Sequence, residues 1–230
     1  MKWFVHSLAG GVGKSTLAVA LALAAAESGK DTILLDASGS GRVADEMLGV
    51  HEVDVLDLTD VAAGEAEAGA VCYRPPKLPN LRYALVSHED PAFIEDYDTE
   101  IRMLEQDCGL LIIDVPAFDR GIRRTPFAEE DRVLLVSRAD RWSYRGLSSL
   151  CGELEQGAAE VIILTNDTAG GGRDKRGAGG EEPWNLPGEK PPVFIERDTS
   201  LPAAAYDRHS LMRTSVGAAA RKLAASLLHS

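Results

Sequence analysis

The sequence predicts a single α/β domain in which a mostly parallel sheet carries helices on both faces. Apolar strand segments alternate with helical segments along the whole chain, which is the pattern of a parallel sheet. The segment 110–114 (L-L-I-I-D) is almost entirely aliphatic, as expected for a strand covered on both faces. With 230 residues, the chain is long enough for one large domain with a sizeable core.

Seven apolar segments are predicted to be strands, and helical segments lie between them. The strands are expected at residues 3–5, 31–36, 81–86, 110–114, 132–137, 160–165 and 193–195. The helices are expected at residues 17–26, 42–48, 57–68, 99–106, 144–156, 201–206 and 216–228. Residues 168–192, rich in glycine and proline, are predicted to form a flexible loop within one domain spanning 1–230, because a strand follows them.

Charge and composition limit the classes of function. The formal net charge of −12 argues against a surface that binds nucleic acid or acidic lipid throughout. Cys72, Cys108 and Cys151 are far apart and form no C-x-x-C pair, which indicates reduced thiols rather than disulfides or a zinc site. The sequence shows no signal peptide, and no apolar run approaches the ~20 residues that span a bilayer. We therefore expect a cytoplasmic protein.

Residues 7–16 (S-L-A-G-G-V-G-K-S-T) lie between the first strand and the first helix and match the end of a phosphate-binding P-loop. The first glycine of the pattern G-x-x-x-x-G-K-[ST] is replaced by Leu8. The glycines allow backbone N–H groups to converge on an anion. Lys14 is then placed to reach the β- and γ-phosphates, and Ser15 to offer its hydroxyl to Mg²⁺. The alternative is a glycine-rich turn that only caps a helix.

Three polar residues follow predicted strands, at the edge where open α/β sheets bind ligands. Asp114 ends the most aliphatic strand, which is the Walker B arrangement for holding Mg²⁺ directly or through water. Asp36 is a candidate for orienting the attacking water or the metal shell. Asn166 is a candidate for hydrogen-bonding a purine base edge. The alternatives are a strand-capping Asp114, a turn-forming Asp36 and a simple Asn-Asp turn at Asn166.

The order of S-L-A-G-G-V-G-K-S-T, L-L-D-A-S-G-S, L-L-I-I-D-V-P-A and I-L-T-N resembles the MinD/ParA group of P-loop ATPases. Residues 47–58 and 195–204 are also similar to segments of that group. The resemblance implies a P-loop NTPase fold, ATP or ADP with Mg²⁺ as cofactors, face-to-face homodimers with sandwiched nucleotides, and slow hydrolysis. It assigns metal binding to Ser15, Asp36 and Asp114, catalysis to Lys14, Asp36 and Asp114, and nucleotide contacts to Gly10, Gly11, Val12, Gly13, Lys14, Ser15, Thr16 and Asn166.

Three positions depart from the family pattern. Ala9 stands where the family has a lysine that crosses the dimer interface to the partner's phosphates, and alanine carries no charge. Ser38 replaces a second acidic residue, and Glu196 stands where proline is common. Loss of a charge that stabilises the transition state can slow phosphoryl transfer ~10³-fold or more. The chain therefore resembles the atypical branch that includes the pilus-localising TadZ/CpaE proteins, without their receiver-like domain.

Arginines near the strand ends could replace the missing charge. The candidates are Arg42, Arg120, Arg123 and Arg124, and the alternative is that they are solvent-facing charges. Residues 120–145 hold seven arginines with Trp142 and Tyr144 among them. This strip is a candidate for nonspecific DNA or partner binding, but interleaved acidic residues favour an ordinary solvated face.

The segment 216–228 is predicted to be a helix docked on the sheet. Its apolar face is narrow, diluted by alanine and without Trp or Phe, whereas membrane-seeking helices usually carry bulky apolar residues opposite a strongly basic face. We therefore expect no peripheral membrane contact from this helix.

The leading interpretation is a nucleotide-dependent homodimer that acts as a switch read by an unidentified protein partner. Such a switch would position a cell division site, a chromosome or plasmid, or pilus machinery. One alternative is a pseudo-ATPase scaffold that holds nucleotide without turnover. Another is a metabolic ligase on a related P-loop fold, such as a dethiobiotin-synthetase-like or cobyrinate-amidase-like enzyme, although the sequence shows no substrate-pocket signature for it.

Overall fold

A seven-stranded, all-parallel sheet forms the centre of the computed structural model. The structure describes residues 1–38, 43–50, 56–87, 92–138, 141–156, 160–166, 193–196, 198–201 and 207–228. The strand order is β3-β2-β4-β1-β5-β6-β7, and every strand pair in the sheet is parallel. The strands are β1 (Lys2–His6), β2 (Thr32–Asp36), β3 (Leu81–Leu85), β4 (Leu110–Asp114), β5 (Arg132–Arg138), β6 (Glu160–Asn166) and β7 (Val193–Ile195). All seven predicted strands and the α/β fold class are confirmed.

Helices cover both faces of the sheet, and most of them match the predictions. They are α1 (Lys14–Glu27), α2 (Val43–Leu48), α3 (Leu58–Ala62), α4 (Phe93–Asp96), α5 (Asp98–Gln106), α6 (Arg141–Gln156), α8 (Arg208–Leu211), α9 (Ser215–Leu227) and the 3-10 helix η1 (Gly121–Arg124). The short α4, η1 and α8 were not predicted.

One predicted helix is too long. The helix expected at 57–68 ends at Ala62, and turns follow it. Its start is set by a capping box in which Asp57 and Asp60 bond each other's backbone N–H groups. Its end is set by Gly64, which adopts a φ of 74° outside the right-handed helical region.

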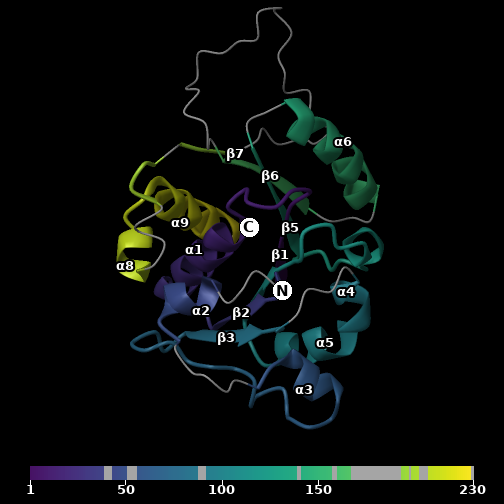
Figure 1. Cartoon of the computed structure of the whole chain (residues 1–230), viewed down its shortest axis with the longest axis vertical. Helices are drawn as coiled ribbons and strands as arrows, with labels where there is room; N and C mark the ends of the chain where they lie inside the picture. Colours follow the sequence, from purple (N-terminus) through teal and green to yellow (C-terminus); the bar gives the residue numbers. More distant parts are fainter. Residues whose placement is uncertain are drawn as a thin grey trace, which may run out of the picture.

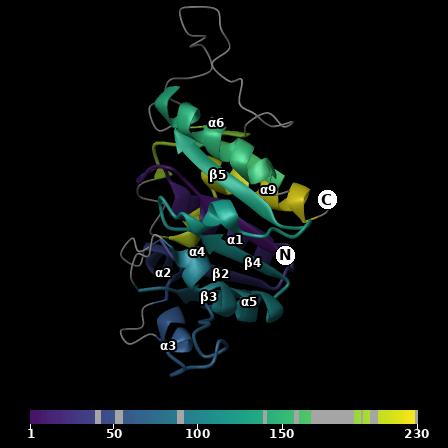
Figure 2. The ribbon, with the colours of Figure 1, turned by 90° about the vertical axis from the view of Figure 1, so that its right-hand side faces the viewer.

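The alternation of side chains along the strands creates a core on each side of the sheet. Trp3 and Val5 of β1 pack into the core shared with α1, α2 and α9, while Phe4 packs into the core shared with α4, α5 and α6. Figure 1 shows α1, α2 and α9 on one side of the strands and α4, α5 and α6 on the other. Figure 2 looks from the side that carries α4, α5 and α6.

Helix α1 packs against both the sheet and α9 and is buried on nearly all sides. Its many alanines allow this close packing, because small side chains let the helix approach both neighbours. Helix α9 buries Val216, Ala220, Leu223 and Leu227 and packs against α1. This is the docked arrangement expected for residues 216–228.

Some predictions lie outside the described residues. They concern the loop 168–192, Arg42, residues 202–206 of the helix predicted at 201–206, and part of the segment 47–58. In the part of the chain that the structure describes, no helix combines the length and the apolar character needed to cross a membrane.

Candidate functional site

The P-loop joins the end of β1 to the start of α1 at the carboxyl edge of the sheet. Gly11 and Gly13 have φ values of 67° and 89°, a region that glycine occupies without strain. Gly13 is the N-cap of α1, and no side chain caps the helix there. The first N–H groups of α1 therefore remain available to an anion, and the helix dipole favours negative charge at this end.

Lys14 and Asp114 meet beneath this loop. The ammonium group of Lys14 donates a hydrogen bond to Oδ1 of Asp114, and both side chains are buried. Burial raises the pKa of Asp114 to about 6; Lys14 opposes this rise and Asp36 adds to it. The parallel register explains the convergence, because Asp114 pairs with Val5 of β1 and with Asp36 of β2.

The residues beside Asp114 fit a magnesium ion. Among the described residues, Oδ2 of Asp114 is a buried oxygen with no hydrogen-bond partner. The Ser15 side chain is close enough to the same carboxylate to lower its pKa, and Asp36 lies at the same level of the neighbouring strand. No group of three His, Cys, Asp or Glu side chains gathers as a metal cage within the described ranges. Mg²⁺ usually needs only one or two carboxylates, completed by water and substrate phosphates.

Asp36 has the turn-forming contacts that its alternative interpretation predicted. Its Oδ1 accepts hydrogen bonds from the backbone N–H of Ser38 at 3.0 Å and from the Ser38 hydroxyl at 2.7 Å. The side chain is also buried and close enough to Asp114 to raise that residue's pKa. Asp36 therefore shapes its own loop and adds negative charge beside Asp114. Its predicted role toward metal or water stays a prediction.

Asn166 contacts the P-loop itself. Its Nδ2 donates to the carbonyl oxygen of Val12 at 3.1 Å, and the side chain is buried. A Cβ added to Gly13 would lie 2.6 Å from the same Nδ2. Asn166 thus supports the loop from β6, a contact that its sequence position does not reveal. The base-edge role stays a prediction.

One arginine of the strip 120–145 lies next to the P-loop backbone, and three others pair with glutamates. Arg138, counted in the sequence only as part of the basic strip, has its Nη2 at 3.5 Å from the carbonyl oxygens of Gly10 and Gly11. Arg123 pairs with Glu153, Arg124 pairs with Glu95 at 3.1 Å, and Arg132 pairs with Glu160 at 2.5 Å. These acidic partners lie outside the strip 120–145. DNA binding by the strip, and the replacement of the missing lysine charge by an arginine, both stay predictions.

His6, the last residue of β1, is a buried polar residue that sequence reasoning did not select. Burial lowers its pKa to about 3; the positive charges of Lys14 and Arg123 add to this, and a hydrogen bond with the Pro116 backbone opposes it. A histidine that ends a buried strand next to a P-loop was the available signal. The imidazole stays neutral near pH 7.

We expect His6→Phe to make stability less sensitive to acid. The unfolded chain protonates His6 near pH 6.5 and the folded chain only near pH 3, so wild-type stability is lost as pH falls below 6.5. Between pH 7 and pH 5, the wild type should lose about 2 kcal/mol of unfolding free energy through His6. Asp114 acts in the opposite direction, because its raised pKa favours the folded state at low pH.

Urea unfolding of both chains at pH 7 and pH 5 measures this difference, with the exposed His209→Gln as control. Equal pH slopes for the wild type and His6→Phe would contradict the assignment.

Comparisons with known proteins agree with this geometry. A family model described as ParA, NUBPL iron-transfer P-loop NTPase, matches residues 1–77. The septum site-determining protein MinD of Synechocystis sp. is 29% identical over 166 residues, which cover 70% of this chain and 62% of that protein. The chain thus spans about three fifths of the length of this relative.

Solved structures support the same fold. MinD of Aquifex aeolicus has a TM-score of 0.76 at 19% identity, covering 100% of this chain and 97% of that one. The same protein in its complex with MinC gives 0.74 at 20% identity, covering 96% and 94%. MinD of Pyrococcus horikoshii complexed with Mg-ADP gives 0.74 at 18% identity, covering 99% and 96%. At these identities the likeness concerns the fold.

Proposed function

We propose that this chain, which belongs to the ParA/MinD family of P-loop NTPases, is an ATP-dependent dimerisation switch that positions a cellular structure. The observation that carries the proposal is the buried pair of Lys14 and Asp114 directly beneath an uncapped, glycine-rich helix start. That arrangement supplies a cation, backbone N–H donors and a carboxylate with a free oxygen at one point.

Each residue has a defined part in this proposal. The backbone of residues 10–16 and the Lys14 ammonium bind the phosphates. Ser15, Asp36 and Asp114 would hold Mg²⁺, which would neutralise charge that develops on the phosphate oxygens. Asn166 keeps the loop in its binding shape through Val12. ATP turnover is slow because Ala9 supplies no charge to a partner's phosphates.

The proposed protein partner is suggested by a similar protein of known structure. A similar chain, MinD of Aquifex aeolicus, was solved together with MinC. We propose that this chain likewise presents a surface to a protein partner when it dimerises. Iron transfer, named in the family description of the N-terminal match, has less support. Burial raises the pKa of Cys72 and Cys108 to about 11, which opposes the thiolate form that ligates metals.

Oligomeric state and turnover test the proposal together. We expect a dimer with Mg-ATP, a monomer with Mg-ADP or without nucleotide, and slow phosphate production, measured by light scattering and a steady-state assay. ATP binding and dimerisation without turnover would favour the pseudo-ATPase scaffold instead. Failure to bind either nucleotide would contradict both.

A further inference from the structure

A pocket of about 400 Å³ lies beside the P-loop, on the side of the sheet that carries α4 and α6. It is lined by His6 at the end of β1, by Leu8 of the P-loop, and by residues 118–120, 123 and 124 from the segment after β4. We call it the arginine pocket, after Arg120, Arg123 and Arg124. Its volume is in the range of small-ligand sites.

The charges of the arginine pocket favour an anion. Among the described residues, the Arg120 guanidinium makes no ion pair or hydrogen bond. The pairs of Arg123 with Glu153 and of Arg124 with Glu95 are solvent-exposed, and exposed pairs are weak enough for an incoming anion to compete. The carboxylate of Asp119 accepts hydrogen bonds from two backbone N–H groups, that of Ile94 at 3.2 Å and that of Ile122 at 2.9 Å.

The wall of the pocket also holds a hydrogen-bond acceptor without a donor. His6 is 1% exposed, and its Nδ1 has no hydrogen-bond partner among the described residues. Proline has no backbone N–H, so the Pro116 carbonyl oxygen accepts from the imidazole. We assign this donor to Nε2, since Nδ1 has no partner, and Nδ1 is then the acceptor nitrogen of a neutral imidazole. A buried acceptor without a partner is costly, so a ligand that donates one hydrogen bond would be favoured here.

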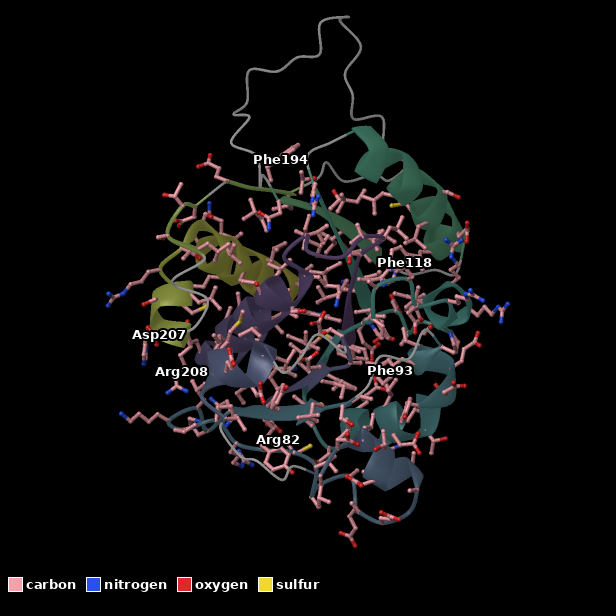
Figure 3. The ribbon with its side chains drawn as sticks, in the orientation of Figure 1. Arg82, Phe93, Phe118, Phe194, Asp207 and Arg208 are labelled. Atoms are coloured by element: carbon pink, nitrogen blue, oxygen red, sulfur yellow. The ribbon has the colours of Figure 1, made fainter. Side chains whose placement is uncertain are left out.

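The rim of the pocket is apolar and strained. Phe118 is 61% exposed and has a φ of 69°, a region that non-glycine residues rarely adopt. It lies on the loop between β4 and η1 (Figure 3). Such strain often marks a functional site. An aromatic ring at the opening also lowers the local dielectric, which strengthens the attraction between the arginines and an anion.

We propose that the arginine pocket binds the hydrogen phosphate dianion. This ion matches the pocket in both respects, because its charged oxygens accept from the arginines and its single P–OH donates to His6 Nδ1. Sulfate has the same charge and nearly the same size, but at neutral pH it has no O–H to donate. The pocket should therefore prefer phosphate to sulfate.

The phosphate can come from solution or from the neighbouring nucleotide site. His6 lies within electrostatic reach of Lys14 as well as of Arg123, so the pocket adjoins the phosphate end of that site. The second source rests on the proposed function: water adds to the γ-phosphorus, the bond to the bridging oxygen breaks, and ATP⁴⁻ with H₂O gives ADP³⁻, HPO₄²⁻ and H⁺. The pocket would then hold the released phosphate.

Equilibrium dialysis of radiolabelled phosphate against the full chain, with excess Mg-ADP to occupy the P-loop, tests the binding. We expect one phosphate per chain, binding at least about 10-fold weaker in Arg120→Ala and unchanged in the exposed Arg102→Ala control. Sulfate should compete at least about 10-fold less well, and His6→Phe should remove that preference. No phosphate bound by the wild type, equal binding by Arg120→Ala, or equal competition by sulfate would each overturn the proposal.

A single-turnover experiment with Mg-ATP separates the two sources. If the hydrolysis product passes through the pocket, a fluorescent phosphate sensor reports release later than bond cleavage, and Arg120→Ala shortens that delay. Release without delay in the wild type overturns the product source and leaves solution phosphate as the ligand. Absence of cleavage contradicts the proposed function, and the dialysis result still decides on the pocket.

Discussion

Lys14→Ala is expected to weaken ATP binding about 100-fold or more and to abolish ATP hydrolysis. The lysine supplies charge-assisted hydrogen bonds to phosphate, each worth about 1.5–3 kcal/mol. No other described lysine lies in the P-loop or at the strand ends beside it. Isothermal titration with Mg-ATP and a phosphate-release assay measure both effects. The matched control is Lys222→Ala, because Lys222 is exposed on α9.

A loss of stability could imitate a loss of binding in this variant. Removing Lys14 leaves the buried Asp114 carboxylate without its partner, which typically costs about 3–5 kcal/mol, although protonation of Asp114 relieves part of that cost. The double variant Lys14→Ala/Asp114→Asn removes the uncompensated charge. It should regain stability in urea unfolding without regaining ATP binding. Wild-type affinity in a folded Lys14 variant would contradict the proposed site.

Gly13→Ala is expected to destabilise the protein without nucleotide by about 1–3 kcal/mol and to weaken ATP binding as well. Gly13 has a φ of 89°, and the new Cβ would lie 2.6 Å from Nδ2 of Asn166. Asn166 would have to move, and its hydrogen bond to Val12 would be lost. The loop would then no longer present its N–H groups in one direction.

Gly10→Ala provides a control three residues away in the same loop. Nothing lies within 4 Å of a Cβ at Gly10, and its φ is not positive, so the unliganded protein should lose little stability. Thermal unfolding of the two variants without nucleotide tests the difference, followed by ATP titration of Gly13→Ala. Equal melting temperatures for both variants would show that Asn166 and the backbone at Gly13 do not constrain the loop.

The sequence was most informative where one local property dominates. Apolar runs identified all seven strands, and most of these strands are buried on both faces and therefore need apolar residues along their length. The same reasoning placed Asp36 and Asp114 at one edge, since parallel strands end at the same side of a sheet. The helix predicted at 57–68 ends at Ala62 in the structure, because Gly64 turns the backbone out of the helical conformation.

Contacts between distant segments were not predictable in this way. His6 became a buried neutral acceptor because the end of β1 is covered by the segment after β4. Arg138 reached the Gly10 and Gly11 carbonyls because β5 lies next to β1 in the sheet. The Asn166 side chain donates a hydrogen bond to the Val12 carbonyl across the same edge of the sheet. Strand order decides each of these contacts, and strand order is not a local property of the chain.

The sequence by itself determined the fold class, the P-loop and the identity of the charged residues at the strand ends. These follow from hydrophobic pattern, glycine content and residue chemistry, which act within a few residues of each other. Only the tertiary structure decided which partners these residues have: Lys14 with Asp114, Asn166 with the P-loop, and His6 with three arginines around a pocket. The physical reason is that pairing energy and burial depend on segments up to 154 residues apart.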